Sequence, residues 1–301
     1  MAASPNGNPV SRLVSLSAGR LQLLLSPAVG GSIARFDFRD GDRRIPIMRG
    51  AEGQPNDVLE SASFPLVPYV NRIRNGRFCF RGREIFLQPN MAGDRSPLHG
   101  QGWLGEWHIA SASPSEATLE YEHLAGEWPW HYLARQLFKL DANGLTVELT
   151  CLNLSADPMP CGLGLHPYFP CSETTRLRTR VEHVWTIDDH ILPIERIPAT
   201  GQFDLTDRPV CGAGLDHGFG GWSGTATVSD PSWPFQVTLS SPGARFFQLY
   251  SPRAGGIFVM EPVTHANAAL NEPEDAWEEL GMRTAMPKAE TMLLTRFDVA
   301  Y

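Results

Sequence analysis

The chain has 301 residues, of which 42% are hydrophobic and 19% charged, and its formal net charge is −8. A chain of this length can bury a large apolar core without needing disulfides, and all-β folds often reach this length as one unit. The acidic balance argues against nucleic acid as a partner, and no apolar run approaches the roughly 20 residues that a membrane span needs.

The N-terminal end is small and polar, so residues 1–10 are predicted to form a flexible leader, followed by a single domain at residues 11–301. This end lacks the apolar segment of a secretory signal. The five cysteines are widely spaced, without a CxxC pair that would indicate zinc or redox chemistry. We therefore expect a cytoplasmic protein with buried, reduced thiols. The cysteines are Cys79, Cys151, Cys161, Cys171 and Cys211.

The 28 glycines and 25 prolines are spread along the whole chain, which favours many short strands over long helices. Short helical candidates occur only at residues 57–61 and 268–280. The pattern predicts an all-β fold, a large antiparallel β-sandwich with few short helices and long loops. Alternation of apolar and polar residues predicts strands at residues 20–25, 30–38, 117–123, 133–140, 145–154, 224–228, 235–239, 246–250, 256–260 and 292–299, and a hairpin at residues 76–87.

Two loop segments in the first third of the chain carry candidate ligand-binding residues. Asn71 and Arg72 lie between apolar residues just ahead of the predicted hairpin. A guanidinium is a fixed fork of donors that can hold a ligand's oxygen atoms, although such an arginine can equally brace a loop. His99 is followed by Gly100 and Gly102, which would let a ligand approach closely. A histidine in a glycine-rich turn can also be purely structural.

Two further segments place an ionisable residue beside glycine, proline or aromatic residues. His166 ends an apolar run, and the proline after it restricts its backbone to an extended conformation. An imidazole in this setting can serve as a general acid or remain a satisfied core histidine. Asp216 is predicted to lie in a glycine-flanked turn, where it could cap the turn or bind a ligand hydroxyl.

Glu261 follows four apolar residues and precedes a proline. A carboxylate at the end of a buried strand loses solvation, which raises its pKa towards the value that a general base at neutral pH requires. No local spacing supports a metal site, a phosphate-binding loop or a serine nucleophile elbow. His99, His166, Asp216 and Glu261 could share a metal only if the fold brought them together.

These segments, taken in order, resemble the galactose mutarotase (aldose 1-epimerase) family, in its incompletely characterised bacterial branch. The resemblance extends over nearly the whole chain, and it implies a β-sandwich with the site on one concave face. It implies that Glu261 is the catalytic base, His166 the catalytic acid and His99 a second histidine that polarises the sugar. Arg72 and Asp216 match sugar-binding positions, and Asn71, Trp103 and Tyr168 are expected to line the same site, Trp103 and Tyr168 as stacking or core residues.

The resemblance implies an enzyme that interconverts the α and β anomers of a hexose without cofactor or metal. The expected partner is a small-molecule sugar, with no nucleic acid or membrane, and the expected state is a monomer or homodimer. Pro262-Val263 replaces the Thr-Gln that follows the glutamate in better-known members, so the preferred sugar stays open.

Three alternatives remain. A hexose-6-phosphate 1-epimerase would need cations at the pocket rim, for which Arg74, Arg77 and Arg95 are candidates. A sugar-binding protein could keep the fold and lack catalysis. A glycosidase or lyase could use Asp216 and Glu261 as paired carboxylates, but would leave the two histidines without a purpose.

Overall fold

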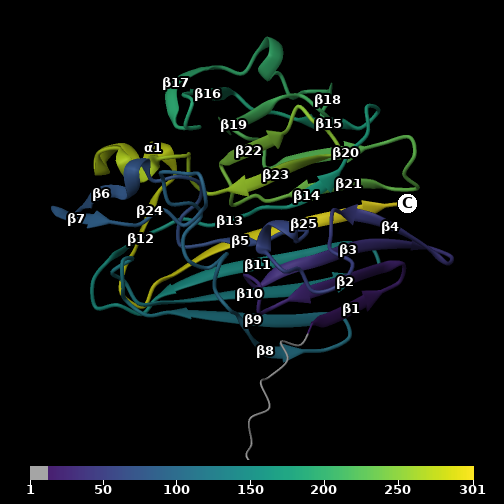
Figure 1. Cartoon of the computed structure of the whole chain (residues 1–301), viewed down its shortest axis with the longest axis horizontal. Coiled ribbons are helices and arrows are strands. Elements are labelled where there is room, and N and C mark those ends of the chain that lie inside the picture. Colours follow the sequence, from purple (N-terminus) through teal and green to yellow (C-terminus); the bar gives the residue numbers. More distant parts are fainter. Residues whose placement is uncertain (1–12) are drawn as a thin grey trace, which may run out of the picture.

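The computed structural model describes residues 13–301, and the regular secondary structure of these residues is almost wholly antiparallel strand (Figure 1). The predicted leader at residues 1–10 lies outside the described residues. The prediction of an all-β fold with few short helices is confirmed. The helical pieces are η1 (Val58–Glu60), η2 (Arg74–Gly76), η3 (Gly201–Phe203), η4 (Ala269–Asn271), η5 (Glu274–Ala276) and α1 (Trp277–Leu280). No helix in the described part is long and apolar enough to cross a membrane.

A nine-stranded sheet forms one large layer of the described residues. Its alternation is clearest in the last strand, where Leu293, Phe297 and Val299 are buried while Glu290 and Asp298 are exposed. The strands, in spatial order, are β18 (Arg208–Pro209), β15 (Arg176–Thr179), β20 (Thr225–Ser229), β21 (Gln236–Ser240), β25 (Glu290–Ala300), β11 (Gly144–Asn153), β10 (Tyr132–Asp141), β9 (Glu116–His123) and β8 (His108–Ala112).

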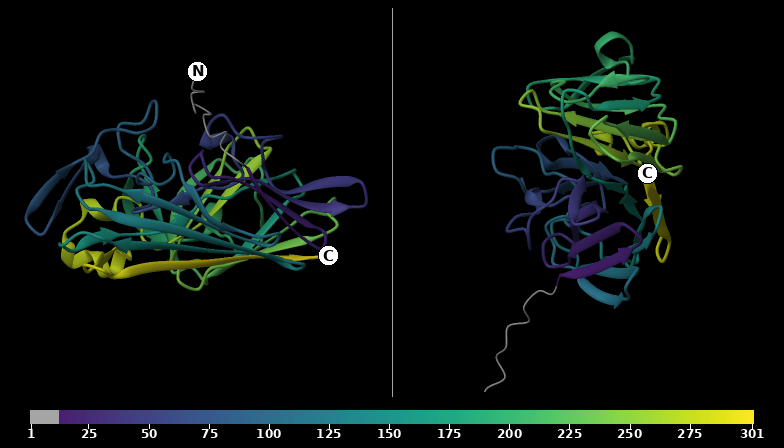
Figure 2. Two further views of the ribbon diagram at one scale, coloured as in Figure 1. Left: turned by 90° about the horizontal axis from the view of Figure 1, so that it is seen from below. Right: turned by 90° about the vertical axis from the view of Figure 1, so that its right-hand side faces the viewer.

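A second sheet carries most of the polar residues discussed below, and in Figure 1 its strands lie above β9, β10 and β11. Its strands, in order, are β17 (Pro193–Pro198), β16 (His183–Ile187), β19 (Leu215–Gly220), β22 (Phe246–Ser251), β23 (Ile257–Val263), β13 (Gly164–Leu165) and β5 (Pro65–Leu66), with β14 (Tyr168–Pro170) also pairing with β23. Figure 2 shows the loops and short strands of the first third of the chain covering one side of these layers.

Smaller sheets complete the fold. The predicted hairpin is present as β6 (Arg77–Phe80) and β7 (Arg83–Phe86), and it projects from one end of the molecule (Figure 2). The other small sheets consist of β12 (Met159–Cys161) with β24 (Arg283–Ala285), and of β1 (Val14–Ala18), β2 (Leu21–Ser26), β3 (Ser32–Asp40) and β4 (Arg43–Met48).

The sequence missed several strands for identifiable reasons. Every residue of β8 is exposed, so it has no apolar alternation to detect. Strands β4 and β17 contain prolines, which lower the strand signal of a segment. Strands β5 and β13 have only two residues each, too few to show a period.

The prediction of buried, reduced thiols is wrong for three of the five cysteines. Cys171, which follows β14, forms a disulfide with Cys211, which precedes β19. Cys79 is exposed, whereas Cys151 and Cys161 are free and buried as expected. The pair at positions 171 and 211 is 40 residues apart, and the fold rather than the spacing brings it together.

Candidate active site

All eight residues singled out from the sequence line one cavity of about 460 Å³. This volume lies within the range of small-molecule sites. The eight come from segments far apart in the chain, and two of them, Trp103 and Tyr168, belong to a cluster of buried apolar and aromatic residues. This cluster comprises Val58, Phe64, Leu66, Val70, Leu98, Trp103, Tyr168, Phe246, Val259, Val263 and Ala266.

The register of three neighbouring strands places polar side chains on the same face of the second sheet. Gln248 of β22 lies directly opposite Glu261 of β23, and Tyr250 of β22 lies opposite Asp216 of β19. Opposite residues of an antiparallel pair share a face, as do residues two apart in a strand, so these four side chains point the same way. All four line the cavity.

Glu261 and His166 lie side by side in the wall of the cavity. The Nε2 atom of His166 is 3.5 Å from Oε1 of Glu261, while Oε2 of Glu261 is buried without a hydrogen-bond partner among the described residues. His166 follows β13 directly, as its position at the end of an apolar run predicted. Its ring stacks on Phe64 with a centroid separation of 4.4 Å. The two groups are therefore held close enough to exchange a proton.

Burial shifts the pKa values of this pair in opposite directions. Burial raises the pKa of Glu261 well above its ordinary value; Asp216 raises it further, and Arg72 lowers it. Burial lowers the pKa of His166 to about 3, and the charge of Arg49 lowers it as well. Without a ligand, the pair therefore favours a protonated Glu261 and a neutral His166. This is the reverse of the starting state that a Glu261 base and a His166 acid require.

The ring of His99 is held in place by Asn71, which lies in the loop that precedes the hairpin. The backbone of His99 has a φ of 59°, and its Nδ1 accepts a hydrogen bond from the backbone N–H of Asn71 at 3.1 Å. Burial, with smaller contributions from His166 and Arg72, holds the pKa of His99 well below its ordinary value. A neutral His99 that accepts at Nδ1 carries its proton on Nε2, so it presents a donor rather than an acceptor at its free nitrogen.

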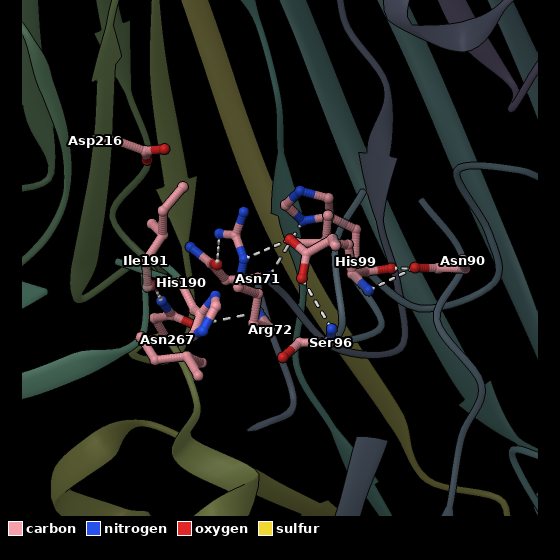
Figure 3. Close-up of polar contacts among 12 residues, drawn as sticks. Asn71, Arg72, Asn90, Ser96, His99, His190, Ile191, Asp216 and Asn267 are labelled. Atoms are coloured by element: carbon pink, nitrogen blue, oxygen red, sulfur yellow. Dashed lines mark hydrogen bonds and ion pairs between the residues drawn. The ribbon is translucent and has the colours of Figure 1, made fainter. Parts of the chain in front are cut away.

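Arg72 is braced within its own loop and held by an acidic partner (Figure 3). Its Nε donates to Asp94 at 2.8 Å, and its Nη1 donates to the side-chain oxygen of Asn71 at 3.2 Å. The other carboxylate oxygen of Asp94 accepts from the backbone N–H of Ser96 at 2.8 Å. The arginine therefore both lines the cavity and braces the loop, the two roles that the sequence left open.

The prediction that Asp216 lies in a turn is wrong, because it is the second residue of strand β19. Its carboxylate accepts a hydrogen bond from Nε2 of Gln248 at 2.8 Å. Burial raises the pKa of Asp216, whereas the charge of Arg72 and the Gln248 hydrogen bond lower it. The flanking glycines, Gly214 and Gly218, suggested a turn, but Gly218 is paired with Gln248 within the strand.

The two aromatic candidates differ in what they present to the cavity. Trp103 is 2% exposed, and its indole N–H donates to the carbonyl of Leu98 at 3.0 Å, so it forms an apolar wall with no free donor. Tyr168 is also largely buried, and burial raises its pKa to about 12, with Arg49 acting in the opposite direction. Tyr168 keeps its hydroxyl protonated, and the Cζ atom of Arg49 lies over its ring.

Four polar wall or support residues were missed: Arg49, Asp94, Gln248 and Tyr250. Gln248 had a detectable signal, because a polar residue inside the buried run of β22 repeats the pattern that singled out Glu261. Arg49 and Asp94 had none, since both belong to irregular segments that only the fold brings to the cavity.

The arginines considered for a phosphate at the rim do not line the cavity. Arg77 pairs with Glu84 on the exposed hairpin, and Arg95 is exposed. Arg74 interacts with Asp188 at 3.8 Å. The four residues considered for a metal do converge, but within the described part of the chain no three His, Cys, Asp or Glu side chains are arranged to hold one ion.

Comparisons with known proteins bear on the family of the chain. The sequence profile named Aldose 1-epimerase matches residues 12–274. Uncharacterized protein YphB of Escherichia coli K12 is 36% identical over 274 residues, which cover 87% of this chain and 91% of that protein. A solved structure of a candidate aldose 1-epimerase from the same organism has a TM-score of 0.88 at 32% identity, over 96% of this chain and 99% of that chain.

A galactose mutarotase-like protein from Clostridium acetobutylicum shares the fold, with a TM-score of 0.82 at 18% identity, over 95% of this chain and 94% of that chain. The profile match spans most of the sequence, and the identity to YphB extends over nearly its full length. The chain belongs to the aldose 1-epimerase family.

Proposed function

We propose that the chain is an aldose 1-epimerase that interconverts the α and β anomers of a hexose by acid and base catalysis. The observation that carries this proposal is the pair formed by His166 and Glu261, 3.5 Å apart in the wall of a cavity of sugar size. Ring opening needs two proton transfers at neighbouring oxygens, and a close acid and base can supply both.

In the proposed reaction, Glu261 takes the proton of the C1 hydroxyl while His166 gives a proton to the ring oxygen. The bond between C1 and the ring oxygen breaks, and its electron pair passes to the ring oxygen as the C1 carbonyl forms. Rotation about the C1–C2 bond then exposes the other face of C1. Closure reverses both proton transfers, so the pair must work in either protonation state.

For this reaction Glu261 and His166 need to carry only one proton between them. In the empty site burial favours that proton on Glu261, and a transfer across the 3.5 Å gap gives the carboxylate and imidazolium that the reaction uses. A bound sugar supports this transfer, because its C1 hydroxyl donates to the carboxylate and its ring oxygen accepts from the imidazolium. Hydrogen bonds to a charged form stabilise that form.

The remaining polar residues are proposed to bind and polarise the sugar. His99 presents an Nε2–H donor towards the cavity, and Arg72 supplies further donors. Asp216, oriented by Gln248, accepts from a sugar hydroxyl. Trp103 closes the site with an apolar wall against which the C–H face of a sugar can pack.

Polarimetry on freshly dissolved α-D-glucose and α-D-galactose tests the proposal. The purified protein should accelerate the approach to the equilibrium rotation for at least one sugar, in proportion to enzyme concentration. Binding of sugars without any acceleration, across neutral and anionic hexoses, would instead identify a non-catalytic sugar-binding protein.

A further inference from the structure

Arg49 is a cation in the cavity wall that forms no ion pair with a carboxylate of the described residues. It follows β4 directly, and its backbone N–H donates to the carbonyl of Tyr168 at 2.8 Å. Within residues 13–301, Arg35, Arg44 and Arg72 all form ion pairs, but no carboxylate lies within ion-pair distance of Arg49.

The direct contacts of the guanidinium are with neutral groups. Burial lowers the pKa of Arg49, and the more distant charge of Glu60 raises it. The Nη2 of Arg49 donates to the carbonyls of Leu59 and Ser61, at 2.8 Å for Ser61, and its Cζ lies 3.7 Å from the centre of the Tyr168 ring. Its Nε is buried with no partner among the described residues. Neutral partners satisfy a guanidinium less well than an anion does, so a half-buried arginine in this state is suited to an anionic ligand.

Arg49 lies on the His166 side of the cavity. The ring of Tyr168 contacts the guanidinium and is also 4.7 Å from the His166 ring, measured between centroids. In the proposed reaction, His166 serves the ring oxygen of the sugar. The C6 carbon of a hexopyranose is two bonds from that oxygen, so a group on C6 can reach the part of the wall that Arg49 occupies.

We propose that Arg49 binds a carboxylate on C6, and that hexuronic acids are preferred to neutral hexoses as substrates. This inference rests on the proposed function, because that function orients the sugar. A single negative charge matches the site better than a phosphate dianion, since Arg72, the other arginine of the cavity wall, is already paired with Asp94. The net charge of −8 also disfavours multiply charged ligands.

The test uses methyl glycosides, which cannot open their rings, so binding is measured apart from catalysis. Methyl glucuronoside and methyl glucoside, and their galacto counterparts, are titrated by ligand-observed NMR. The wild type should bind at least one uronoside about tenfold or more tightly than the matching glycoside, as expected for a hydrogen bond to a charged group. In Arg49→Gln this ratio should fall to about one.

Two variants separate recognition from folding. Arg49→Lys keeps the charge and should retain part of the preference, whereas Arg44→Gln, an exposed arginine on the adjoining strand β4, should leave the ratio unchanged. A wild-type ratio of one or less overturns the inference, as does a ratio that is the same in Arg49→Gln. Tighter binding of methyl glucoside 6-phosphate than of the uronoside overturns the carboxylate assignment.

Catalysis is then measured on free glucuronate and galacturonate. Binding that depends on Arg49, without interconversion of anomers, would sustain the assignment of Arg49 to a C6 carboxylate and reject the proposed function. If the anomers interconvert but the preference for uronosides does not depend on Arg49, the proposed function is sustained and the role of Arg49 is rejected.

Discussion

Replacing Glu261 by glutamine is the most direct perturbation of the proposed chemistry. Glutamine keeps the size and shape of a protonated glutamate but can neither take nor give the proton that the pair shares. A positioned acid or base typically contributes about 10²–10⁴-fold, so turnover should fall by about 10³-fold.

The structure predicts that this variant stays folded. Glu261 is 3% exposed, and burial already favours its neutral form, which glutamine mimics. The free energy of unfolding should therefore change by no more than about 1 kcal/mol, the size of one neutral hydrogen bond. Urea denaturation followed by tryptophan fluorescence measures this change.

Polarimetry on the sugar that the wild type converts best gives the activity. His166→Asn should cause a loss of similar size, and the double variant should lose little more than the worse single variant, because the two residues act as a unit. Glu290→Gln, an exposed carboxylate at the start of β25, is the matched control and should retain full activity. A folded Glu261→Gln protein with wild-type turnover would refute the assignment of the proton pair.

Three further predictions concern binding and stability. Gln248→Leu removes the donor that orients Asp216. Steady-state kinetics should show KM raised about tenfold, with a smaller change in kcat. An unchanged KM would show that Gln248 does not contribute to substrate binding. Burial lowers the pKa of His265 to about 4. Between pH 6.5 and pH 4 the unfolded chain therefore binds a proton at His265 that the folded chain does not bind. The free energy of unfolding should fall by about 3 kcal/mol for this residue as the pH drops through that range. Urea titrations across that range should show a shallower pH slope in His265→Gln, and equal slopes would contradict the assignment. Gly100→Ala should destabilise the protein by roughly 2–4 kcal/mol in the same assay, because Gly100 has a φ of +75° and an added Cβ would lie 2.1 Å from the carbonyl oxygen of Val67; a neutral result would mean that this loop can shift freely.

The alternation of apolar and polar residues was sufficient to predict the fold class. Long strands such as β10 and β25 bury every second residue, and that period is written directly in the sequence. Segments without this period could not be found in the same way. Strand β8 is exposed throughout, and β13 is only two residues long.

The sequence alone also identified the ionisable residues that stand in unusual surroundings. Glu261 and His166 are recognisable because a polar residue at the end of an apolar run must be buried with the run. Their separation of 3.5 Å is a tertiary property, set by the pairing of β13 and β14 with β23. The protonation state of the pair is tertiary as well, because it depends on burial and on the distances to Asp216, Arg72 and Arg49.

The residues that only the tertiary structure revealed are those whose role depends on neighbours distant in the chain. Arg49 follows an unpredicted strand and reaches the cavity because its backbone pairs with Tyr168. Cys171 and Cys211 are joined only because the end of β14 and the segment before β19 meet. A sequence determines which side chains must be buried and with what period, whereas long-range strand pairing decides which of them meet.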